Sequence, residues 1–194
     1  MTIQEMNEKL LYQVQKTVLH HGSAVIAIDG RCASGKSTLA AWLQERTDAN
    51  LIHLDDFFLR KEQRTKERFI QPGENVDHER FLKEVLLPLY EKKAFGYRPF
   101  DCTSMSLQKE IEVPVKQVNI IEGSYCMRED LRKYYDLKIF LKVDPAIQMQ
   151  RIQKRDPKKA EDFQKKWIPL EEEYFKACRI EEVCDETIDT SFLF

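Results

Sequence analysis

Gly30-Arg31-Cys32-Ala33-Ser34-Gly35-Lys36-Ser37 is the stretch of sequence that decides the fold. It fits the pattern G-x-x-x-x-G-K-[ST] at every fixed position. The apolar run Ala24–Asp29 comes directly before it, and Ser37–Arg46 follows with helical spacing of its apolar residues. This order of strand, glycine loop and helix is typical of a phosphate-binding loop, because glycines let the backbone curl and turn its N–H groups inward.

The loop predicts a binding site for a nucleoside triphosphate with Mg²⁺. The N-terminal end of the following helix is positive and attracts the phosphates. In this pattern Lys36 reaches the β- and γ-phosphates, where it acts catalytically, and the Ser37 hydroxyl coordinates Mg²⁺. The residues that we expect to bind ATP are Gly30, Ala33, Ser34, Gly35, Lys36, Ser37 and Thr38.

Strands and helices alternate along the rest of the chain, which favours an α/β fold with a mainly parallel sheet. Residues 1–194 read as one domain, with the amphipathic helix of residues 1–21 packed on it. The further strands are expected at Asn50–Leu54, Gln117–Ile121, Leu137–Val143 and, at an edge, Thr187–Thr190. The further helices are expected at Asp77–Lys93, Glu129–Tyr135, Pro145 to about Asp156, and Glu161–Cys178.

Prolines and charged residues interrupt this pattern in three places. Pro88 and Pro169 fall inside predicted helices and are expected to kink them or, at Pro88, to end the helix early. Arg60–Glu74 is highly charged and contains Pro72-Gly73, so it is predicted to be a loop or a mobile segment. Trp167 and Tyr174 lie seven apart and are predicted to pack on the sheet from one face of the last helix.

Carboxylates stand at the ends of two predicted strands. Asp55-Asp56 follow one strand, and Glu122 follows another. Ligands of open parallel sheets bind beyond the carboxyl ends of the strands, so these acids are expected near the phosphate loop. Phosphoryl transfer needs such groups to hold Mg²⁺ and to accept the proton of the attacking hydroxyl. The side chains of Asp55 and Asp56 are expected to diverge, so that one of them faces the γ-phosphate.

The composition of the chain indicates which classes of binding partner and which cellular environment it suits. The chain has 31 basic and 33 acidic side chains, a formal net charge of −2, which argues against binding nucleic acid or an anionic membrane. The five cysteines are an odd number without a C-x-x-C pair, which favours free thiols in a reducing cytoplasm. There is no apolar run of about 20 residues and no signal-peptide core. The sequence is compatible with a homo-oligomer.

Four segments in order carry a resemblance to a known family: Ser34–Ser37, Leu54–Phe58, Ile120–Gly123 and Arg151–Asp156. Together they resemble the uridine kinase and phosphoribulokinase group of P-loop kinases. The resemblance implies a three-layer fold with a parallel core of five strands and a mobile lid. It also implies ATP as donor, Mg²⁺ as cofactor and a hydroxyl of a small molecule as acceptor.

The resemblance also implies roles for single residues. Asp55 stands at the position of the catalytic base, and Ser37 and Glu122 stand at the metal-binding positions, with Asp55 near the ion. The lid is expected at about residues 150–162. Arg151 and Arg155 lie four apart on its predicted helix, share a face, and are expected to clamp the transferring phosphoryl oxygens.

For the acceptor, the resemblance points to two segments. Asn75-Val76-Asp77-His78 looks like the segment that holds ribose hydroxyls in uridine kinases, with Asp77 at the acidic position. Tyr97 and Phe100 are expected beside the acceptor as well. Met105 stands where the group has a base-reading histidine, and an apolar residue discriminates less than a hydrogen-bonding one.

The most direct functional expectation is therefore a kinase that phosphorylates a nucleoside. The first alternative is a kinase of a pantothenate-like molecule, a sugar or a sugar phosphate. The second alternative belongs to another class, a non-catalytic switch whose bound nucleotide controls a partner protein. The chain lacks the N-K-x-D element with which a GTPase reads guanine. Multiple-turnover phosphorylation of a metabolite distinguishes a kinase from a switch.

Overall fold

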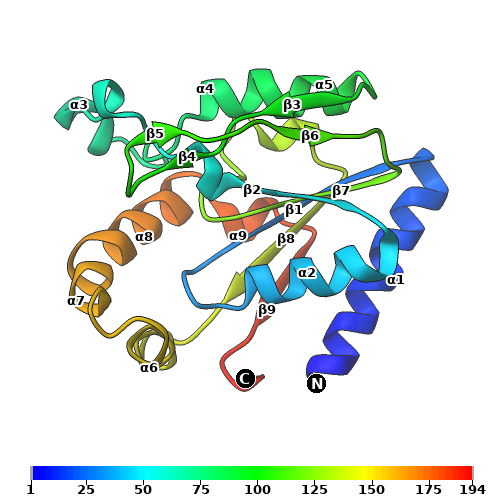
Figure 1. Ribbon diagram of the computed structural model, residues 1–194. Helices are drawn as coiled ribbons and strands as arrows, with labels where there is room; N and C mark the ends of the chain where they lie inside the picture. The colour runs from blue at the N-terminus through cyan, green and yellow to red at the C-terminus, as the bar shows by residue number, and fades with distance from the viewer. Residues whose placement is uncertain (1, 194) are drawn as a thin grey trace.

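Five parallel strands form the central sheet of the computed structural model, which describes residues 2–193 (Figure 1). The order across the sheet is β2-β7-β1-β8-β9. The strands are β1 Ala24–Gly30, β2 Asn50–His53, β7 Val118–Glu122, β8 Leu137–Lys142 and β9 Glu186–Asp189. The predicted three-layer α/β fold is confirmed, and the strand that leads into the phosphate loop lies at its centre.

Helices cover the two faces of the sheet with separate apolar cores. On one face, α1 (Ile3–His21) and α2 (Lys36–Thr47) pack against Ile26 and Ile28 of β1. On the other face, Ala27 of β1 belongs to a core that includes residues of α4, α8 and α9. These helices are α4 His78–Phe81, α8 Ile168–Ala177 and α9 Ile180–Val183. Successive side chains of β1 point to opposite faces of the sheet, so this strand contributes residues to both cores.

Two prolines are accommodated by π turns. The helix predicted at Asp77–Lys93 is built from α4, the π turn η3 (Leu82–Leu86) and α5 (Leu87–Tyr90), and it continues past Pro88. A proline lacks the N–H that an α-helix needs and clashes with the carbonyl four residues earlier. The wider π turn changes the backbone hydrogen bonding just before the proline, so the helix does not end at Pro88. A second π turn, η5 (Phe163–Trp167), precedes Pro169 in the same way.

Several short elements differ from the prediction. Arg60–Glu74 contains two helical segments, η2 (Lys61–Gln63) and α3 (Lys66–Phe69), and Glu129–Tyr135 has only the 3₁₀ turn η4 (Arg132–Tyr134). Two small antiparallel pairs were not predicted: β3 Phe95–Tyr97 with β6 Ile111–Val113, and β4 Phe100–Asp101 with β5 Ser106–Leu107. The remaining helices are η1 Leu54–Phe57, α6 Pro145–Arg155 and α7 Ala160–Asp162.

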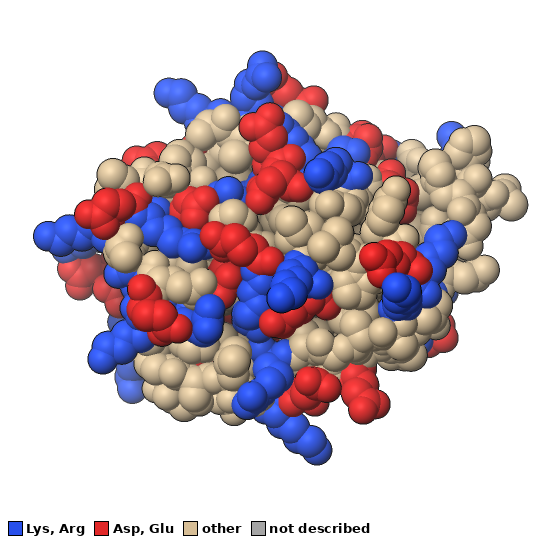
Figure 2. Space-filling model, turned by 90° about the horizontal axis from the view of Figure 1, so that it is seen from above, with Lys and Arg blue, Asp and Glu red and all other residues tan. Residues whose placement is uncertain are grey.

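The surface is highly charged, with the two signs mixed. Figure 2 shows acidic and basic side chains interspersed over the face that it presents.

Among residues 2–193, no helix is both long and apolar enough to cross a membrane.

Gly30 is the backbone position on which the phosphate loop depends. It has φ +145°, and a Cβ atom there would lie 2.1 Å from the carbonyl oxygen of Leu141 on β8. We expect Gly30→Ala to lower the free energy of unfolding by about 3 kcal/mol or more. The backbones of β1 and β8 are both fixed in the sheet, so neither can move away from the added methyl group. Chemical denaturation followed by circular dichroism measures this.

Gly22 supplies the matched control. It also has a positive φ, +76°, but a Cβ atom there meets nothing within 4 Å. Gly22→Ala should therefore cost only the strain of the left-handed backbone, about 1 kcal/mol. Equal costs at the two positions would contradict the close approach of β1 to β8.

Candidate active site

The carboxyl ends of β1, β2 and β7 meet at one edge of the sheet. β1 leads into the loop Arg31–Gly35, β2 leads into η1 with Asp55, and β7 ends at Glu122. The register pairs Glu122 with Ile28 of β1 and with His53 of β2. The residues that the sequence places far apart are thus brought to the same end of three neighbouring strands.

The phosphate loop has the conformation that its glycines predict. Ala33 and Gly35 have positive φ values, +60° and +96°. The amides of Lys36, Ser37 and Thr38 open α2 and donate no hydrogen bond within residues 2–193. The Lys36 ammonium lies 2.8 Å from the carbonyl oxygen of Gly30 and 3.1 Å from that of Arg31. The loop therefore offers free N–H groups and a cation at one place.

A buried carboxylate holds the start of the loop. Asp29 is fully buried and accepts hydrogen bonds from the amide of Gly30 (2.7 Å), the amide of Met127 (3.1 Å) and the Tyr174 hydroxyl (2.7 Å). Burial raises the pKa of Asp29 above its ordinary value, although these hydrogen bonds and the charge of Lys36 oppose the shift. Asp29 thereby ties the end of β1 to the loop after β7 and to α8.

Two oxygen atoms of the site are suited to a magnesium ion. The Ser37 hydroxyl donates to Glu122 Oε1 at 3.1 Å, and both residues line the cavity described below. Adjacent ligands of octahedral Mg²⁺ at 2.0–2.1 Å lie about 3 Å apart, and Mg²⁺ prefers such hard oxygen donors. The residues at the two predicted positions therefore fit the ion.

His53 shares the same carboxylate. Its Nδ1 lies 2.6 Å from Glu122 Oε1, and this hydrogen bond raises the pKa of His53 above its ordinary value of 6.5. Burial alone would raise the pKa of Glu122, but the hydrogen bond from His53 and the charge of Lys36 hold it below its usual value. Glu122 is consequently a carboxylate at neutral pH, as a metal ligand must be.

The adjacent carboxylates Asp55 and Asp56 diverge. Asp55 lines the cavity and is exposed to it, whereas Asp56 accepts a hydrogen bond from the Tyr97 hydroxyl at 3.0 Å and is not part of the cavity wall. Protein atoms surround Asp55 on its other sides, and this desolvation raises its pKa, with Glu122 adding to the shift and Lys36 opposing it. Of the two acids, Asp55 is the one that can meet an acceptor hydroxyl.

One cavity of about 890 Å³ joins these groups. From the phosphate loop, Ala33, Gly35, Lys36, Ser37 and Thr38 line it, while Gly30 and Ser34 lie behind the wall. Aromatic and charged side chains make up most of the remaining wall. Its aromatic residues are Phe58, Phe69, Tyr125, Phe163 and Trp167, and Asn75 is one of its uncharged polar residues.

Both predicted lid arginines line the cavity. Arg151 donates to the carbonyl oxygens of Ala33 (3.2 Å) and Thr190 (2.7 Å), so it also ties the loop to the segment after β9. Arg155 donates to the Cys32 thiol at 3.3 Å, and its guanidinium lies over the ring of Phe163. Their contact with a transferring phosphoryl group, and the motion of a lid, stay predictions.

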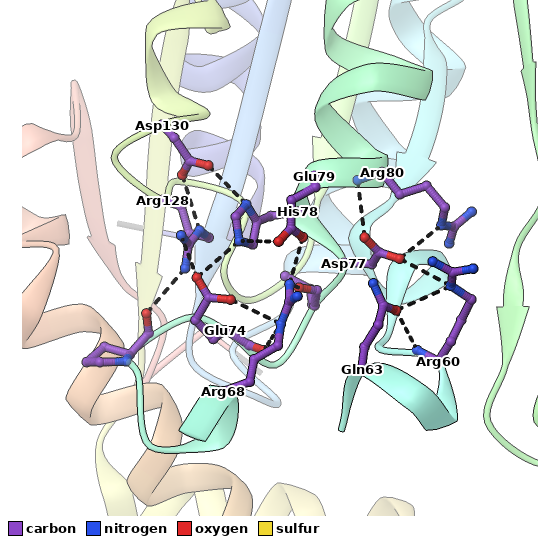
Figure 3. Close-up of polar contacts among 12 residues, drawn as sticks. Arg60, Gln63, Arg68, Glu74, Asp77, His78, Glu79, Arg80, Arg128 and Asp130 are labelled. Atoms are coloured by element: carbon purple, nitrogen blue, oxygen red, sulfur yellow. Dashed lines mark hydrogen bonds and ion pairs between the residues drawn. The ribbon is translucent and has the colours of Figure 1, made fainter. Parts of the chain in front are cut away.

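The three residues predicted to bind the acceptor do not line this cavity. Tyr97 and Phe100 are buried, and Tyr97 donates to Asp56. Asp77 caps α4 through the amide of Arg80 and forms ion pairs with Arg60 (3.5 Å) and Arg80 (3.7 Å), as Figure 3 shows. Asn75, two residues earlier, does line the cavity. The acceptor roles of Asp77, Tyr97 and Phe100 stay predictions.

An ion-pair network fixes the segment that carries Asn75. The carboxylate of Glu74 forms ion pairs with Arg68 at 3.1 Å, with Arg128 at 2.9 Å and with His78 at 3.0 Å. His78 also pairs with Asp130 (Figure 3). Ligand atoms of Glu74, His78 and Glu79 lie close enough to hold a metal. Two guanidinium groups already bind Glu74, however, so this cluster supports the cavity wall by ion pairing.

Two cavity residues had no distinguishing signal in the sequence. Glu171 stands in a run of three glutamates, and only the fold shows which one is buried at the phosphate loop. Trp167 was predicted to pack on the sheet with Tyr174. Tyr174 is fully buried in the core beside the sheet, whereas Trp167 is half-buried and lines the cavity.

Solved structures provide a comparison for the whole chain. A protein from Bacillus stearothermophilus, described as a possible uridine kinase, matches with a TM-score of 0.68 and 21% identity, over 96% of this chain and 99% of its own. The chain has the fold of the P-loop kinases.

Two further proteins share the P-loop kinase fold. One is from Silicibacter sp. TM1040 and is provisionally named a fructose transport system kinase; it has a TM-score of 0.66 and 23% identity, over 92% of this chain and 98% of its own. The other, YFH7 of Saccharomyces cerevisiae, is provisionally named a P-loop kinase with a circular permutation. It has a TM-score of 0.70 and 12% identity, over 94% of this chain and 98% of its own. No protein-family model and no curated protein matches the chain.

The contact between His53 and Glu122 gives a prediction for titration. Glu122→Gln removes the negative charge and leaves a weaker hydrogen-bond partner, so the pKa of His53 should fall back toward 6.5. Imidazole resonances followed by NMR across pH measure it, with His20 and His21 as internal controls. An unchanged pKa for His53 would mean that Glu122 does not set its charge.

The raised pKa of Asp55 gives a prediction for stability. A carboxyl whose pKa is raised on folding destabilises the protein above its ordinary pKa, and this cost disappears as pH falls below both values. Asp55→Asn should therefore raise the Tm at pH 7, and the gain should shrink toward pH 4. Asp101→Asn is the control of opposite sign, because hydrogen bonds from Thr103 and Ser104 lower the pKa of Asp101. A lower Tm for Asp55→Asn at pH 7 would contradict this cost.

Proposed function

We propose that the chain is an ATP-dependent kinase of the uridine kinase and phosphoribulokinase group, which transfers the γ-phosphate of ATP to a hydroxyl of a small molecule. One observation carries the proposal. The phosphate loop, the Ser37–Glu122 pair and the exposed carboxylate of Asp55 line the same cavity at the carboxyl ends of parallel strands. This is the set of groups that phosphoryl transfer requires.

Each group has a part in the reaction. The amides at the start of α2 and the Lys36 ammonium bind the phosphates and stabilise the charge that develops on them. Asp55 orients the acceptor hydroxyl and takes its proton as the bond to phosphorus forms. Arg151 and Arg155 neutralise the transferring group and help to exclude water. Ser37 and Glu122, with Asp55 near, would hold Mg²⁺, which would supply positive charge to offset the negative charge of the phosphates.

For the acceptor, a nucleoside is the first candidate. The aromatic side chains of Phe58, Phe69 and Trp167 provide flat apolar walls, and Asn75 and Tyr125 provide hydrogen-bonding groups among them. Asn75 donates to the Tyr125 hydroxyl at 3.2 Å, so the two groups are positioned together. Such a cavity suits a molecule with a flat ring and several hydroxyls.

A specific observation supports the alternative of an anionic acceptor such as a sugar phosphate. Arg64 lines the cavity and contacts the carbonyl oxygen of Leu59 and the Cys102 thiol. Lys166 also lines it and lies over the rings of Phe69 and Trp167. Neither cation has a carboxylate partner within residues 2–193. An anionic group on the acceptor would neutralise them.

ADP formation from ATP with Mg²⁺, measured against separate acceptors, tests the proposal. The panel contains uridine, cytidine, other nucleosides, pantothenate, fructose and sugar phosphates. We expect one class to stimulate turnover, and Asp55→Asn to reduce that turnover by about 10²–10⁴-fold.

Asp56→Asn is the matched control, because it makes the same change one residue away, outside the cavity wall. It should keep most of the turnover. Tight ATP binding without turnover on any acceptor would favour the nucleotide-dependent switch instead.

A further inference from the structure

Glu171 of α8 is a buried carboxylate bound to the phosphate loop. It is 6% exposed, and its Oε2 accepts a hydrogen bond from the amide of Cys32 at 3.0 Å. Its Oε1 accepts from the Ser124 hydroxyl at 2.7 Å. Both partners line the cavity, as Glu171 itself does. The reaction outlined above assigns no part to this carboxylate.

Cys32 lies at the end of the loop where the γ-phosphate is expected. The amides that open α2 take the phosphates nearer to the helix, and the lysine of this loop reaches on to the β- and γ-phosphates. The Lys36 ammonium lies beside the carbonyl oxygens of Gly30 and Arg31, next to Cys32, and 3.5 Å from the Ser124 hydroxyl. One of the two donors that hold Glu171, the Ser124 hydroxyl, therefore lies beside the ammonium that serves the γ-phosphate.

The helix is anchored so that Glu171 stays at these donors. The next residue, Glu172, forms an ion pair with Arg31 at 2.6 Å, and Arg31 also donates to the carbonyl oxygen of Val143. The Tyr174 hydroxyl binds Asp29 below the loop. In Figure 1, α6, α7 and α8 form an arc beside the loop between β1 and α2. Movement of Glu171 away from the loop thus involves the helix that forms the cavity wall.

We infer that Glu171 is a specificity-determining residue of the phosphate site, whose carboxylate competes with the γ-phosphate of ATP for the Cys32 amide and the Ser124 hydroxyl. The inference rests on the proposed function. Two anions cannot share one set of donors without repulsion, so ATP must displace Glu171, whereas ADP leaves it in place. Glu171 accordingly weakens the binding of ATP relative to ADP.

Isothermal titration calorimetry of the full chain with Mg²⁺–ATP and with Mg²⁺–ADP tests this. Glu171→Gln keeps the shape of the side chain and removes its charge. We expect it to strengthen ATP binding relative to ADP by about tenfold. Glu173→Gln is the matched control, since it removes the same charge from an exposed residue of the same helix, and it should leave the ratio unchanged.

Each outcome has one meaning. An unchanged or smaller preference for ATP in Glu171→Gln would overturn the inference and indicate that the carboxylate supports the bound nucleotide. Wild-type protein that binds neither nucleotide would instead contradict the proposed function. If Glu171→Gln does not fold, as judged by its thermal unfolding, Glu171→Ala is titrated in its place, and the same ratio decides.

Discussion

The parallel register of β1 with β7, and of β7 with β2, is the constraint on which the site depends. It sets Glu122 beside Ile28 on one side and beside His53 on the other. A slip of one residue would turn every side chain of β7 to the opposite face of the sheet. Glu122 would then leave Ser37, and the oxygen pair suited to Mg²⁺ would be lost. The geometry of the site is therefore a property of the whole sheet.

Electrostatics then determines what this geometry can bind. The Lys36 ammonium interacts with four carboxylates, those of Asp29, Asp55, Glu122 and Glu171. Desolvation by the surrounding protein atoms raises the pKa of Asp29, Asp55 and Glu171, so these charges cost free energy in the folded chain. A bound metal ion would bring a compensating positive charge. Stability is given up at the place where phosphoryl chemistry needs charged groups.

The sequence predicted the parts of the molecule that follow local rules. The glycine pattern requires a loop of one shape, and parallel strands end at one edge, so Lys36, Ser37, Asp55 and Glu122 could be placed near each other. The π turns before Pro88 and Pro169 could not be predicted, because the packing of the helices decides whether a proline bends, ends or widens a helix.

The acceptor side of the cavity depended on long-range contacts instead. Asp77, which the sequence predicts to bind the acceptor, forms ion pairs with Arg60 and Arg80, whereas Asn75 lines the cavity wall. The acceptor role of Asp77 stays a prediction. Glu171 looks the same in sequence as its two neighbours, and only the docking of α8 on the phosphate loop distinguishes it. Such residues acquire their roles from the tertiary structure alone.

The central claim is that the cavity transfers a phosphoryl group to an acceptor molecule. The most direct measurement follows ATP that is labelled in its γ-phosphate, with Mg²⁺ and a defined mixture of nucleosides, pantothenate, sugars and sugar phosphates. The account predicts that the label moves into one new organic phosphate, in amounts that exceed the enzyme many times over. Label that stays in ATP, or appears only as inorganic phosphate, would contradict it.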